Sequence, residues 1–365
     1  GAEGALDAMV DSEGNAWVDA LQEPDAVHEL TDLFLDRPQG PRRARIQSRV
    51  LDRAALERTR RGNVRVGTAD QTNSWALCGD SFLKVYRRLD FARNLDVEVL
   101  EALSDRQDLS VPRLRAVLDV DRRGETAALM VVQEAVPHER NAWDAACAEV
   151  ARAAASDPPD PRGWELLGRR VAELHGAMAE TFGIEFLPED RKDRFGSAAV
   201  DLARSVLDEL ASKDRDGWNA ATADQADVLL ESADSIHALF GGAVPSGLVL
   251  QRVHGDLHLG QILSREGDWT IIDFEGEPAR PAHERAAKAH AAKDVSGMLR
   301  SFDYASRAGL PEGASETAVA NAIAWRDAAR RAFLDGYFAH PPVDFLWPSD
   351  PVARERLLSF HEAEK

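Results

Sequence analysis

Short runs of alternating apolar and polar residues fill the chain from about residue 63 to residue 136. They are separated by Gly, Asp and Asn turns and predict strands at 63–68, 74–78, 81–87, 113–120 and 127–136. A helix is expected between the third and fourth strands, at 95–103. Apolar residues at helical spacing in the acidic first 40 residues predict a helical cap. The nine arginines of residues 41–65 either pair with that cap or form a solvated charged face.

Helical spacing prevails after Pro137. It predicts helices at 141–155, 161–181 and about 190–239, and again from 282 to the end except for a Pro-rich loop at 341–351. A second β patch interrupts this pattern at 248–253, 261–263 and 269–274, with a turn at 266–268. We therefore expect an α+β fold with an N-terminal cap (1–62), a small β-rich lobe (63–137) and a large helical lobe (138–365).

Composition narrows the classes of function. Sixty-three acidic against 44 basic residues give a net charge of −19, which argues against a general binder of nucleic acid or membrane surfaces. Small molecules or cationic partners fit better. Two cysteines cannot build a disulfide framework, no stretch is long and apolar enough to span a bilayer, and no signal peptide is visible. We expect a cytoplasmic monomer or homodimer with no nucleic-acid or membrane partner.

The densest polar cluster in an apolar setting is Val-His-Gly-Asp-Leu-His-Leu-Gly-Gln at 253–261, followed by Ile-Ile-Asp-Phe-Glu-Gly-Glu-Pro at 271–278. Asp256 and Asp273 stand across one expected hairpin, so their carboxylates can face a common point. Phosphoryl transfer from ATP needs this arrangement, since one carboxylate accepts the acceptor's proton while another, with an amide oxygen, holds Mg²⁺. A metal-dependent hydrolase built on His254, Asp256 and His258 is the competing hypothesis.

These two passages resemble the catalytic and metal-binding loops of the aminoglycoside phosphotransferase superfamily, which is related to the protein kinases. Within it, they are similar to the actinobacterial maltokinase and glucosamine kinase group, as are the run 294–304, Trp325 and the run 333–337. The resemblance covers most of the chain from about residue 63 onward. It implies a bilobal, protein-kinase-like fold and an enzyme that uses ATP and Mg²⁺ to phosphorylate a sugar hydroxyl.

The resemblance also assigns roles to residues of the passages 253–261 and 271–278. Asp256 matches the catalytic base, and Asp273 matches a metal ligand of the Asp-Phe-Gly motif, written here as Asp-Phe-Glu. Gln261 takes the place of a metal-binding Asn and is one methylene longer, but it still offers a carbonyl oxygen. His254 is expected to brace the loop structurally.

The β-rich lobe supplies the remaining elements of a kinase in the required order. Lys84, the sole lysine in the first 191 positions, lies among apolar residues in a predicted strand, and Glu98 in the next helix is expected to fix it against the nucleotide phosphates. No Gly-x-x-x-x-Gly-Lys-Ser/Thr string occurs, so a P-loop kinase is excluded. Further nucleotide contacts are expected from a turn without kinase glycines and from the hinge after the last strand: Gln71, Asn73, Ser74, Gln133, Glu134 and Val136.

The acceptor is expected to be glucosamine, phosphorylated at O6, with a maltokinase that forms maltose 1-phosphate as the alternative. Maltokinases resemble each other in an aromatic, glycine-rich start, whereas this chain opens on an acidic helical segment. A desolvated glucosaminium ion must be paired with a carboxylate. We expect sugar contacts at His258, Glu277, Asp303 and Trp325, although Arg300 is an alternative, structural partner of Asp303. A non-catalytic kinase-like binding module would lack the lysine, the base or the metal aspartate, and all three are present.

Overall fold

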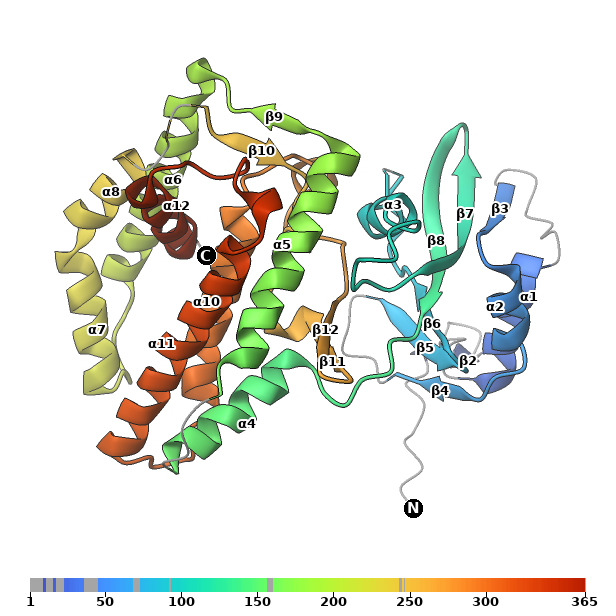
Figure 1. Ribbon diagram of the computed structural model, residues 1–365, viewed down its shortest axis with the longest axis horizontal. Coiled ribbons are helices and arrows are strands. Elements are labelled where there is room, and N and C mark those ends of the chain that lie inside the picture. Colours follow the sequence, from blue (N-terminus) through green and yellow to red (C-terminus); the bar gives the residue numbers. More distant parts are fainter. Residues whose placement is uncertain are drawn as a thin grey trace. The chain divides into compact units, whose positions relative to one another are not determined.

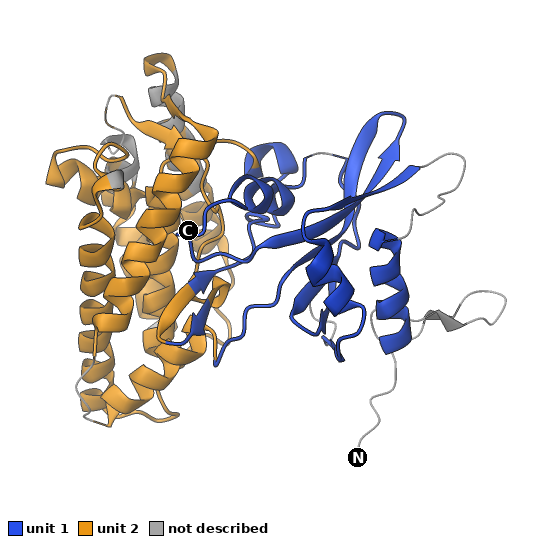
Figure 2. Cartoon of the chain, turned by 45° about the vertical axis from the view of Figure 1, so that its right-hand side comes forward, with its two compact units in different colours: residues 1–139, 263–266, 270–285 blue, residues 140–262, 267–269, 286–365 orange. Residues whose placement is uncertain are grey.

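The computed structural model describes residues 9–10, 16–17, 23–35, 45–67, 73–91, 93–155, 160–242, 245 and 247–364. The chain divides into two compact units (Figure 2). Unit 1 comprises residues 1–139, 263–266 and 270–285, and unit 2 comprises residues 140–262, 267–269 and 286–365. The first division lies beside the predicted boundary at Pro137. Residues 1–62, predicted as a separate cap, fall within unit 1.

A six-stranded antiparallel sheet forms the body of unit 1 (Figure 1). Its strands, in spatial order, are β3 (Arg45–Val50), β7 (Leu114–Arg122), β8 (Glu125–Glu134), β6 (Ser81–Val85), β5 (Ser74–Cys78) and β4 (Val64–Val66). Five of them lie at predicted strands, and β3 was not predicted. A separate two-stranded sheet pairs β1 (Met9–Val10) with β2 (Ala16–Trp17).

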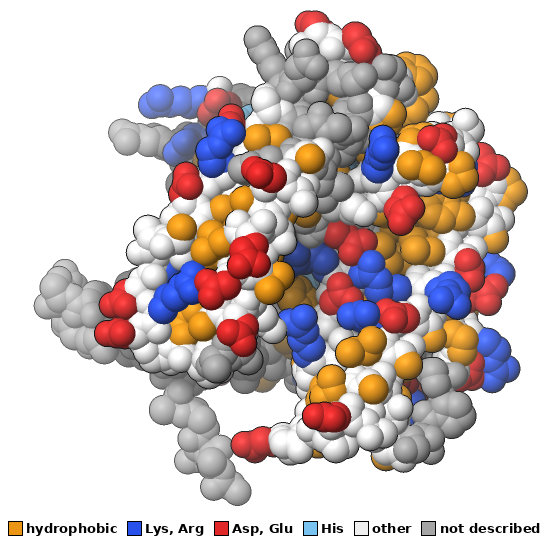
Figure 3. Space-filling model, turned by 90° about the vertical axis from the view of Figure 1, so that its left-hand side faces the viewer, with side chains coloured by type: hydrophobic (Ala, Val, Ile, Leu, Met, Phe, Trp, Pro, Cys, Tyr) orange, Lys and Arg blue, Asp and Glu red, His pale blue; other side chains and the backbone are white. Residues whose placement is uncertain are grey.

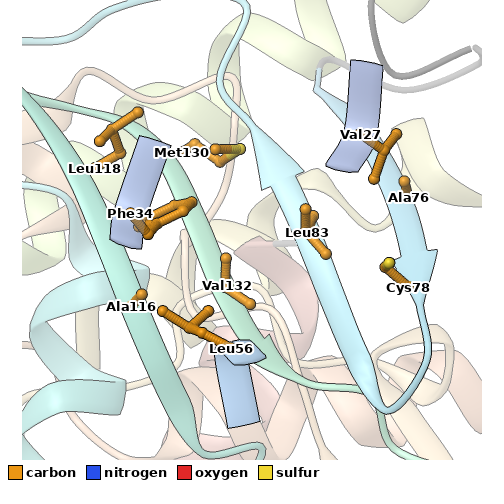
Figure 4. Packing of buried hydrophobic residues seen from close by; sticks show 10 residues of the cluster. All are labelled: Val27, Phe34, Leu56, Ala76, Cys78, Leu83, Ala116, Leu118, Met130 and Val132. Carbon is orange, nitrogen blue, oxygen red and sulfur yellow. The ribbon is translucent and has the colours of Figure 1, made fainter. Parts of the chain in front are cut away.

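Helices α1 (Pro24–Leu35) and α2 (Arg53–Thr59) pack on one face of the sheet. Strand alternation sends every second side chain to this face, and Figure 4 shows the resulting core of Val27, Phe34, Leu56, Ala76, Cys78, Leu83, Ala116, Leu118, Met130 and Val132. The acidic and basic halves of the N-terminal region also meet, since Arg60 Nε lies 2.7 Å from Asp32 Oδ1. The pairing of the two segments was one of the two outcomes left open by the sequence.

The other face of the sheet presents polar chemistry. Because Leu83 belongs to the core, its neighbour Lys84 projects from the opposite face. There it contacts Asp96 of helix α3 (Leu95–Ala102), the predicted 95–103 helix. This helix begins where the Asn94 side chain accepts a hydrogen bond from the Val97 amide, an N-cap interaction. The lysine strand and the helix are thus neighbours on the face opposite α1 and α2.

Unit 2 is mainly helical. Helices α5 (Arg162–Phe182) and α11 (Glu316–Phe338) approach so closely that a Cβ on Gly168 or Gly336 would lie 1.9 Å from a carbonyl oxygen of the other helix. The predicted single segment 190–239 is three helices, broken at residues 213–219 and at Ser232. The helices of the unit are α4 (Ala142–Ala154), α5 (Arg162–Phe182), α6 (Glu189–Ser212), α7 (Ala220–Glu231), α8 (Ala233–Gly242), α10 (Ala292–Ala308), α11 (Glu316–Phe338) and α12 (Pro351–Glu364), with a short 3-10 turn at Pro341–Val343.

The second β patch differs from the predicted one. Strand β10 (Val249–Gln251) pairs with β9 (Ile184–Phe186), which was not predicted, instead of with the strands that follow it. Those strands, β11 (Ile262–Arg265) and β12 (Asp268–Ile271), form a hairpin of their own. Its two-residue turn has positive φ at Glu266 (50°) and Gly267 (82°), as a type I′ turn requires. The predicted turn at 266–268 is therefore confirmed.

The surface carries the many charged residues that the composition contains. Acidic and basic side chains are interspersed over the face shown in Figure 3. Within the described ranges, no helix has the length and apolar character needed to cross a membrane. Short helix α9 (Ala282–Arg285), which follows the Asp-Phe-Glu run, belongs to unit 1.

Candidate active site

In unit 2, helix α10 holds the loop 253–261 at three positions on one of its faces. Asp294 accepts the amide hydrogens of His254 (2.7 Å) and Gly255 (2.8 Å), and Ser301 Oγ accepts the amide hydrogen of Leu259 (3.2 Å). Gly297, between them, lies so near the loop that a Cβ there would be 2.4 Å from the Leu257 carbonyl oxygen. The spacing i, i+3, i+7 brings these residues to one side of the helix. The loop that carries Asp256 is therefore anchored through its backbone.

A buried chain of hydrogen bonds supports Asp294 from behind. His175 Nε2 lies 3.1 Å from Asp294 Oδ2, and its Nδ1 lies 2.8 Å from the Tyr337 hydroxyl, which accepts the indole hydrogen of Trp347. Burial by itself would raise the pKa of Asp294, but its hydrogen bonds to His175 and the Gly255 amide outweigh burial and lower the pKa to about 2. Asp294 is thus held ionised as the acceptor for the loop.

Asp256 lines a cavity of about 250 Å³ in unit 2. The aromatic side chains of Trp143 and Tyr304 form part of the wall, together with His258 and Arg300. Arg300 is held there by hydrogen bonds to the Glu362 carbonyl oxygen (3.0 Å) and to the Tyr304 hydroxyl. A carboxylate beside flat aromatic faces is suited to a polyhydroxylated ligand, since rings cover its apolar face while the carboxylate accepts a hydroxyl hydrogen.

In unit 1, Lys84 lies among three carboxylates. Its Nζ is 2.9 Å from Asp273 Oδ1 and 3.6 Å from Asp96 Oδ2, and it also forms an ion pair with Glu275. Burial would lower the pKa of Lys84, but the negative charges of Asp96, Asp273 and Glu275 raise it well above its usual value. The amine stays protonated, which is the form that binds nucleotide phosphates.

The helix partner of Lys84 differs from the predicted one. Asp96, rather than Glu98, lies beside the lysine ammonium, and Glu98 forms an ion pair with Arg93 at 3.2 Å. Two successive helical steps rotate a side chain by about 200°, so Asp96 and Glu98 cannot face the same point. Asp96 also accepts the amide hydrogen of Phe274 at 3.2 Å and thereby ties helix α3 to the Asp-Phe-Glu run.

The Asp-Phe-Glu run has the properties of a cation site. Asp273 adopts a φ of +67°, a conformation that costs free energy in a residue with a Cβ and is concentrated at functional sites. Carboxylate oxygens of Asp96, Asp273 and Glu275 all lie within 4.8 Å of one another. Oxygen donors of this kind are the ligands that Mg²⁺ takes, so the set fits a divalent cation. Burial is the main cause that raises the pKa of Glu275.

The other predicted nucleotide contacts have these positions. Gln71 lies outside the described residues. Asn73 Nδ2 donates to Glu275 Oε1 (3.0 Å), and Ser74 Oγ accepts from Arg87 (2.8 Å). The predicted hinge residues Gln133 and Glu134 end strand β8, with Val136 just beyond it, and Gln133 Oε1 is buried with no hydrogen-bond partner within the described part of the chain.

Of the four predicted sugar contacts, one lines the Asp256 cavity and three do not. His258 lines the Asp256 cavity, where its Nδ1 also accepts the Gly260 amide hydrogen (3.0 Å). Glu277, in unit 1, forms an ion pair with Arg280 (2.7 Å). Asp303 pairs with Arg330 (3.1 Å) and Arg326 (3.5 Å), so its partners are these arginines rather than Arg300.

The prediction that Trp325 offers an exposed ring for stacking on the sugar is wrong. The side chain is 1% exposed, packs edge-on against Trp164 and Phe302, and donates its indole hydrogen to Glu149 Oε2 (2.9 Å). Both of its faces therefore lie in the aromatic core of unit 2. The aromatic residues that do line the Asp256 cavity, Trp143 and Tyr304, were missed, although Tyr304 ends the run 294–304.

His254 has a bracing contact, whereas metal binding by Gln261 stays a prediction. His254 is 2% exposed, and its Nδ1 accepts the Asp256 amide hydrogen at 3.4 Å, a bracing contact. Gln261 ends a 3-10 turn (Leu259–Gln261) and belongs to unit 2. Of the described residues, His254, Asp256 and His258 do not form a group with metal-ligand spacing, which argues against the hydrolase hypothesis.

Comparison with known proteins identifies the family of the chain. Residues 57–346 match the Phosphotransferase enzyme family. The chain belongs to this family. Among curated phosphotransferases, it is 28% identical over 369 residues to a glucosamine kinase of Streptacidiphilus jiangxiensis, covering 91% of this chain and 79% of that protein. It is also 28% identical over 247 residues to a glucosamine kinase of Mycolicibacterium smegmatis, covering 65% of this chain and 58% of that protein.

Solved structures show the same fold. A glucosamine kinase in complex with glucosamine, ADP and inorganic phosphate matches with a TM-score of 0.71 at 23% identity, over 98% of this chain and 80% of that one. Crystal form A of a glucosamine kinase matches with a TM-score of 0.71 at 25% identity, over 98% of this chain and 78% of that one. The protein is thus an ATP-dependent phosphotransferase with an alcohol acceptor and the kinase-like fold of its family.

Proposed function

We propose that this phosphotransferase transfers the γ-phosphate of ATP to O6 of glucosamine and forms glucosamine 6-phosphate. The observation that carries the proposal is the position of Asp256, on a backbone-anchored loop in the wall of a cavity with two aromatic side chains. Two relatives of the chain, from Streptacidiphilus jiangxiensis and Mycolicibacterium smegmatis, are glucosamine kinases, which supports this choice of sugar.

Asp256 acts as the catalytic base in this proposal. Its carboxylate accepts the hydrogen of the acceptor hydroxyl and orients the oxygen toward the γ-phosphate as the phosphoryl group is transferred. Trp143 or Tyr304 covers the apolar face of the sugar ring, and His258 lies in the same wall. Because Asp294 accepts the amide hydrogens of His254 and Gly255, the two residues before Asp256, the Asp256 side chain starts from a defined backbone position.

In this proposal Lys84 binds the α- and β-phosphates, and Asp273 and Gln261 would hold Mg²⁺. When bound, Mg²⁺ supplies positive charge that stabilises the transferring phosphoryl group. Lys84 Nζ lies 2.9 Å from Asp273 Oδ1, so the residue proposed to bind the phosphates and one that would hold the cation are neighbours. Asn73, Ser74 and the hinge residues at the end of β8 contact the rest of the nucleotide.

The amino group of glucosamine needs a carboxylate partner. Asp256 is the carboxylate among the described residues that line the acceptor cavity, and the base cannot serve both atoms. We assign the amine to Glu277, whose carboxylate follows Asp273 by four positions and is half-buried. Glu277 would then exchange its ion pair with Arg280 for hydrogen bonds donated by the amine.

A panel of acceptors tests the assignment. ATP consumption is measured with glucosamine, glucose, maltose and an aminoglycoside, each with wild type and with Glu277→Gln. We expect the highest kcat/KM for glucosamine, and a loss in Glu277→Gln that is larger for glucosamine than for glucose. Faster turnover of maltose than of glucosamine would overturn the proposed acceptor, and equal losses on both hexoses would overturn the role of Glu277.

A further inference from the structure

Tyr337, in the last turn of helix α11, has its hydroxyl at the centre of the buried hydrogen-bond chain that reaches Asp294. The side chain is fully buried. Its oxygen lies 2.8 Å from His175 Nδ1 of α5 and 3.1 Å from Trp347 Nε1, in the segment before α12. Burial raises the pKa of Tyr337, so the hydroxyl keeps its hydrogen. A hydroxyl has one hydrogen, which it can donate to one of the two partners only.

The identity of the atoms decides the direction of each hydrogen bond in this chain. The indole nitrogen of Trp347 can only donate, so the Tyr337 oxygen accepts its hydrogen. Asp294 is ionised and can only accept, so Nε2 of His175 carries the hydrogen of their contact. The Tyr337 hydroxyl then donates to the lone pair on Nδ1 of a neutral His175. A protonated Nδ1 would leave the hydroxyl hydrogen without an acceptor among the described residues.

The hydrogen on His175 Nε2 holds the Asp294 carboxylate in one orientation. Oδ2 accepts this hydrogen at 3.1 Å and the His254 amide hydrogen at 2.7 Å, while Oδ1 accepts the Gly255 amide hydrogen at 2.8 Å. Because the terminal torsion of an aspartate is soft, the third hydrogen bond, from α5, opposes rotation of the carboxylate away from the two amides. Asp256 directly follows these two residues, so the orientation of the carboxylate affects where the loop places Asp256.

The segment that carries Trp347 is itself fixed to the start of helix α10. His290 Nε2 donates to the Leu346 carbonyl oxygen (3.0 Å), and its Nδ1 accepts the amide hydrogen of Ala292, the first residue of α10 (3.0 Å). Burial lowers the pKa of His290 to about 3, so the ring stays neutral at neutral pH and keeps both contacts. Tyr337 therefore accepts its indole hydrogen from a segment that is held in place against α10.

We propose that Tyr337 is a positioning residue for phosphoryl transfer. Its hydroxyl fixes the hydrogen of His175 on Nε2, and His175 in turn orients the Asp294 carboxylate that holds the loop. The inference rests on the role proposed above for Asp256, and adds that the rate depends on a residue that does not line the Asp256 cavity. Partners that orient a metal ligand without touching the metal change affinity or activity by about 10–100-fold. We expect the lower end here, because Asp294 keeps its two amide hydrogen bonds.

Steady-state kinetics of Tyr337→Phe, which removes the hydroxyl and keeps the ring, tests the proposal. We expect kcat to fall about tenfold with little change in KM for ATP or for the acceptor, because the variant alters the orientation of the loop rather than a contact with either substrate. The acceptor is whichever sugar wild type phosphorylates fastest, so a wrong choice of sugar does not affect the result. The matched control is Trp325→Phe, which removes another buried hydrogen bond of unit 2, to Glu149, and should lower the melting temperature without lowering kcat.

Two substitutions of His175 separate the roles of its ring nitrogens. Gln can place its amide hydrogen near the position of Nε2, and Asn can place one near the position of Nδ1. His175→Gln should therefore keep more of the wild-type kcat than His175→Asn, at similar melting temperatures. Since Tyr337 acts through His175 in the proposal, adding Tyr337→Phe to His175→Gln should cause no further loss of kcat.

Amide hydrogen exchange measures the support of the loop without turnover. NMR should show faster exchange of the His254 and Gly255 amides in Tyr337→Phe, and wild-type exchange in Trp325→Phe. Wild-type kcat in Tyr337→Phe, unchanged exchange of these two amides, or full additivity with His175→Gln would overturn the proposal. Wild-type kcat in Asp256→Asn beside a loss in Tyr337→Phe would reject the proposed base while supporting the positioning role of Tyr337.

Discussion

Replacing Gly297 by alanine would separate helix α10 from the loop that carries Asp256. A Cβ at this position would lie 2.4 Å from the Leu257 carbonyl oxygen, whereas ordinary contacts are 3.4–4 Å. The Leu257 oxygen is a backbone atom and the added Cβ is bonded directly to the backbone, so side-chain rotation cannot relieve this contact. The loop or the helix must therefore move by about 1 Å, and the Leu257 carbonyl belongs to the residue directly after Asp256.

A displacement of this size has two measurable effects. Overpacking in a well-packed region costs about 1–3 kcal/mol of stability. A shift of about 1 Å at a catalytic group costs on the order of a hundredfold in rate. We therefore expect kcat to fall about 100-fold in Gly297→Ala, with a smaller change in KM for ATP, since Lys84 and Asp273 lie in unit 1.

Steady-state kinetics with thermal unfolding of the same samples measures both effects. The matched control is Gly163→Ala, also on a helix of unit 2, where a Cβ would make only an ordinary contact of 3.7 Å with Trp269. Alanine has the higher helix propensity, so this control should be as stable as wild type or more so, with unchanged kcat. Wild-type kcat in Gly297→Ala would refute the close support of the loop by α10.

Three further outcomes follow from individual contacts. The pKa of Asp294 is lowered from 3.8 to about 2, so its ionised form stabilises the fold by about 2 kcal/mol above pH 3.8. This stabilisation is lost as the pH falls toward 2. In calorimetry, the melting temperature of wild type should therefore fall more steeply with decreasing pH than that of Asp294→Asn. Asp96→Asn should lower kcat/KM for ATP more than Glu98→Gln does, because Asp96 contacts Lys84. A larger loss in Glu98→Gln would instead support Glu98 as the partner of the lysine. Trp325→Phe should lower the melting temperature without changing KM for the sugar, whereas Tyr304→Ala should raise that KM with little effect on melting.

The sequence predicted the elements that local patterns determine. Five strands of the six-stranded sheet, helix α3 and the turn at 266–268 all have strong local signals in alternation, capping or turn residues. Strand β3 was missed because it is an edge strand with an exposed, arginine-containing pattern, and its place depends on pairing with β7, almost 70 residues away. Strand β9 was missed for the same reason, since its partner β10 is more than 60 residues later in the chain.

The candidate site shows the same limit at the level of side chains. A motif identified Asp256, Lys84 and Asp273, and the structure brings Lys84 and Asp273 into contact. Periodicity could not decide between Asp96 and Glu98, because both are buried and only the rotation of α3 selects one. It could not reveal that Trp325 faces the core, since the apolar and small residues of α11 surround the helix rather than forming one stripe. Both distinctions depend on tertiary packing.

The most direct test of the proposed function identifies the product. Wild type and Asp256→Asn are incubated with ATP, Mg²⁺ and glucosamine, and the sugars are analysed by ³¹P and ¹H NMR. We expect glucosamine 6-phosphate from wild type, and at least about a hundredfold slower formation by the variant, because a transition-state contact of the hydroxyl is removed. No phosphorylated glucosamine from wild type, or equal rates of formation by the two proteins, would contradict the proposed function.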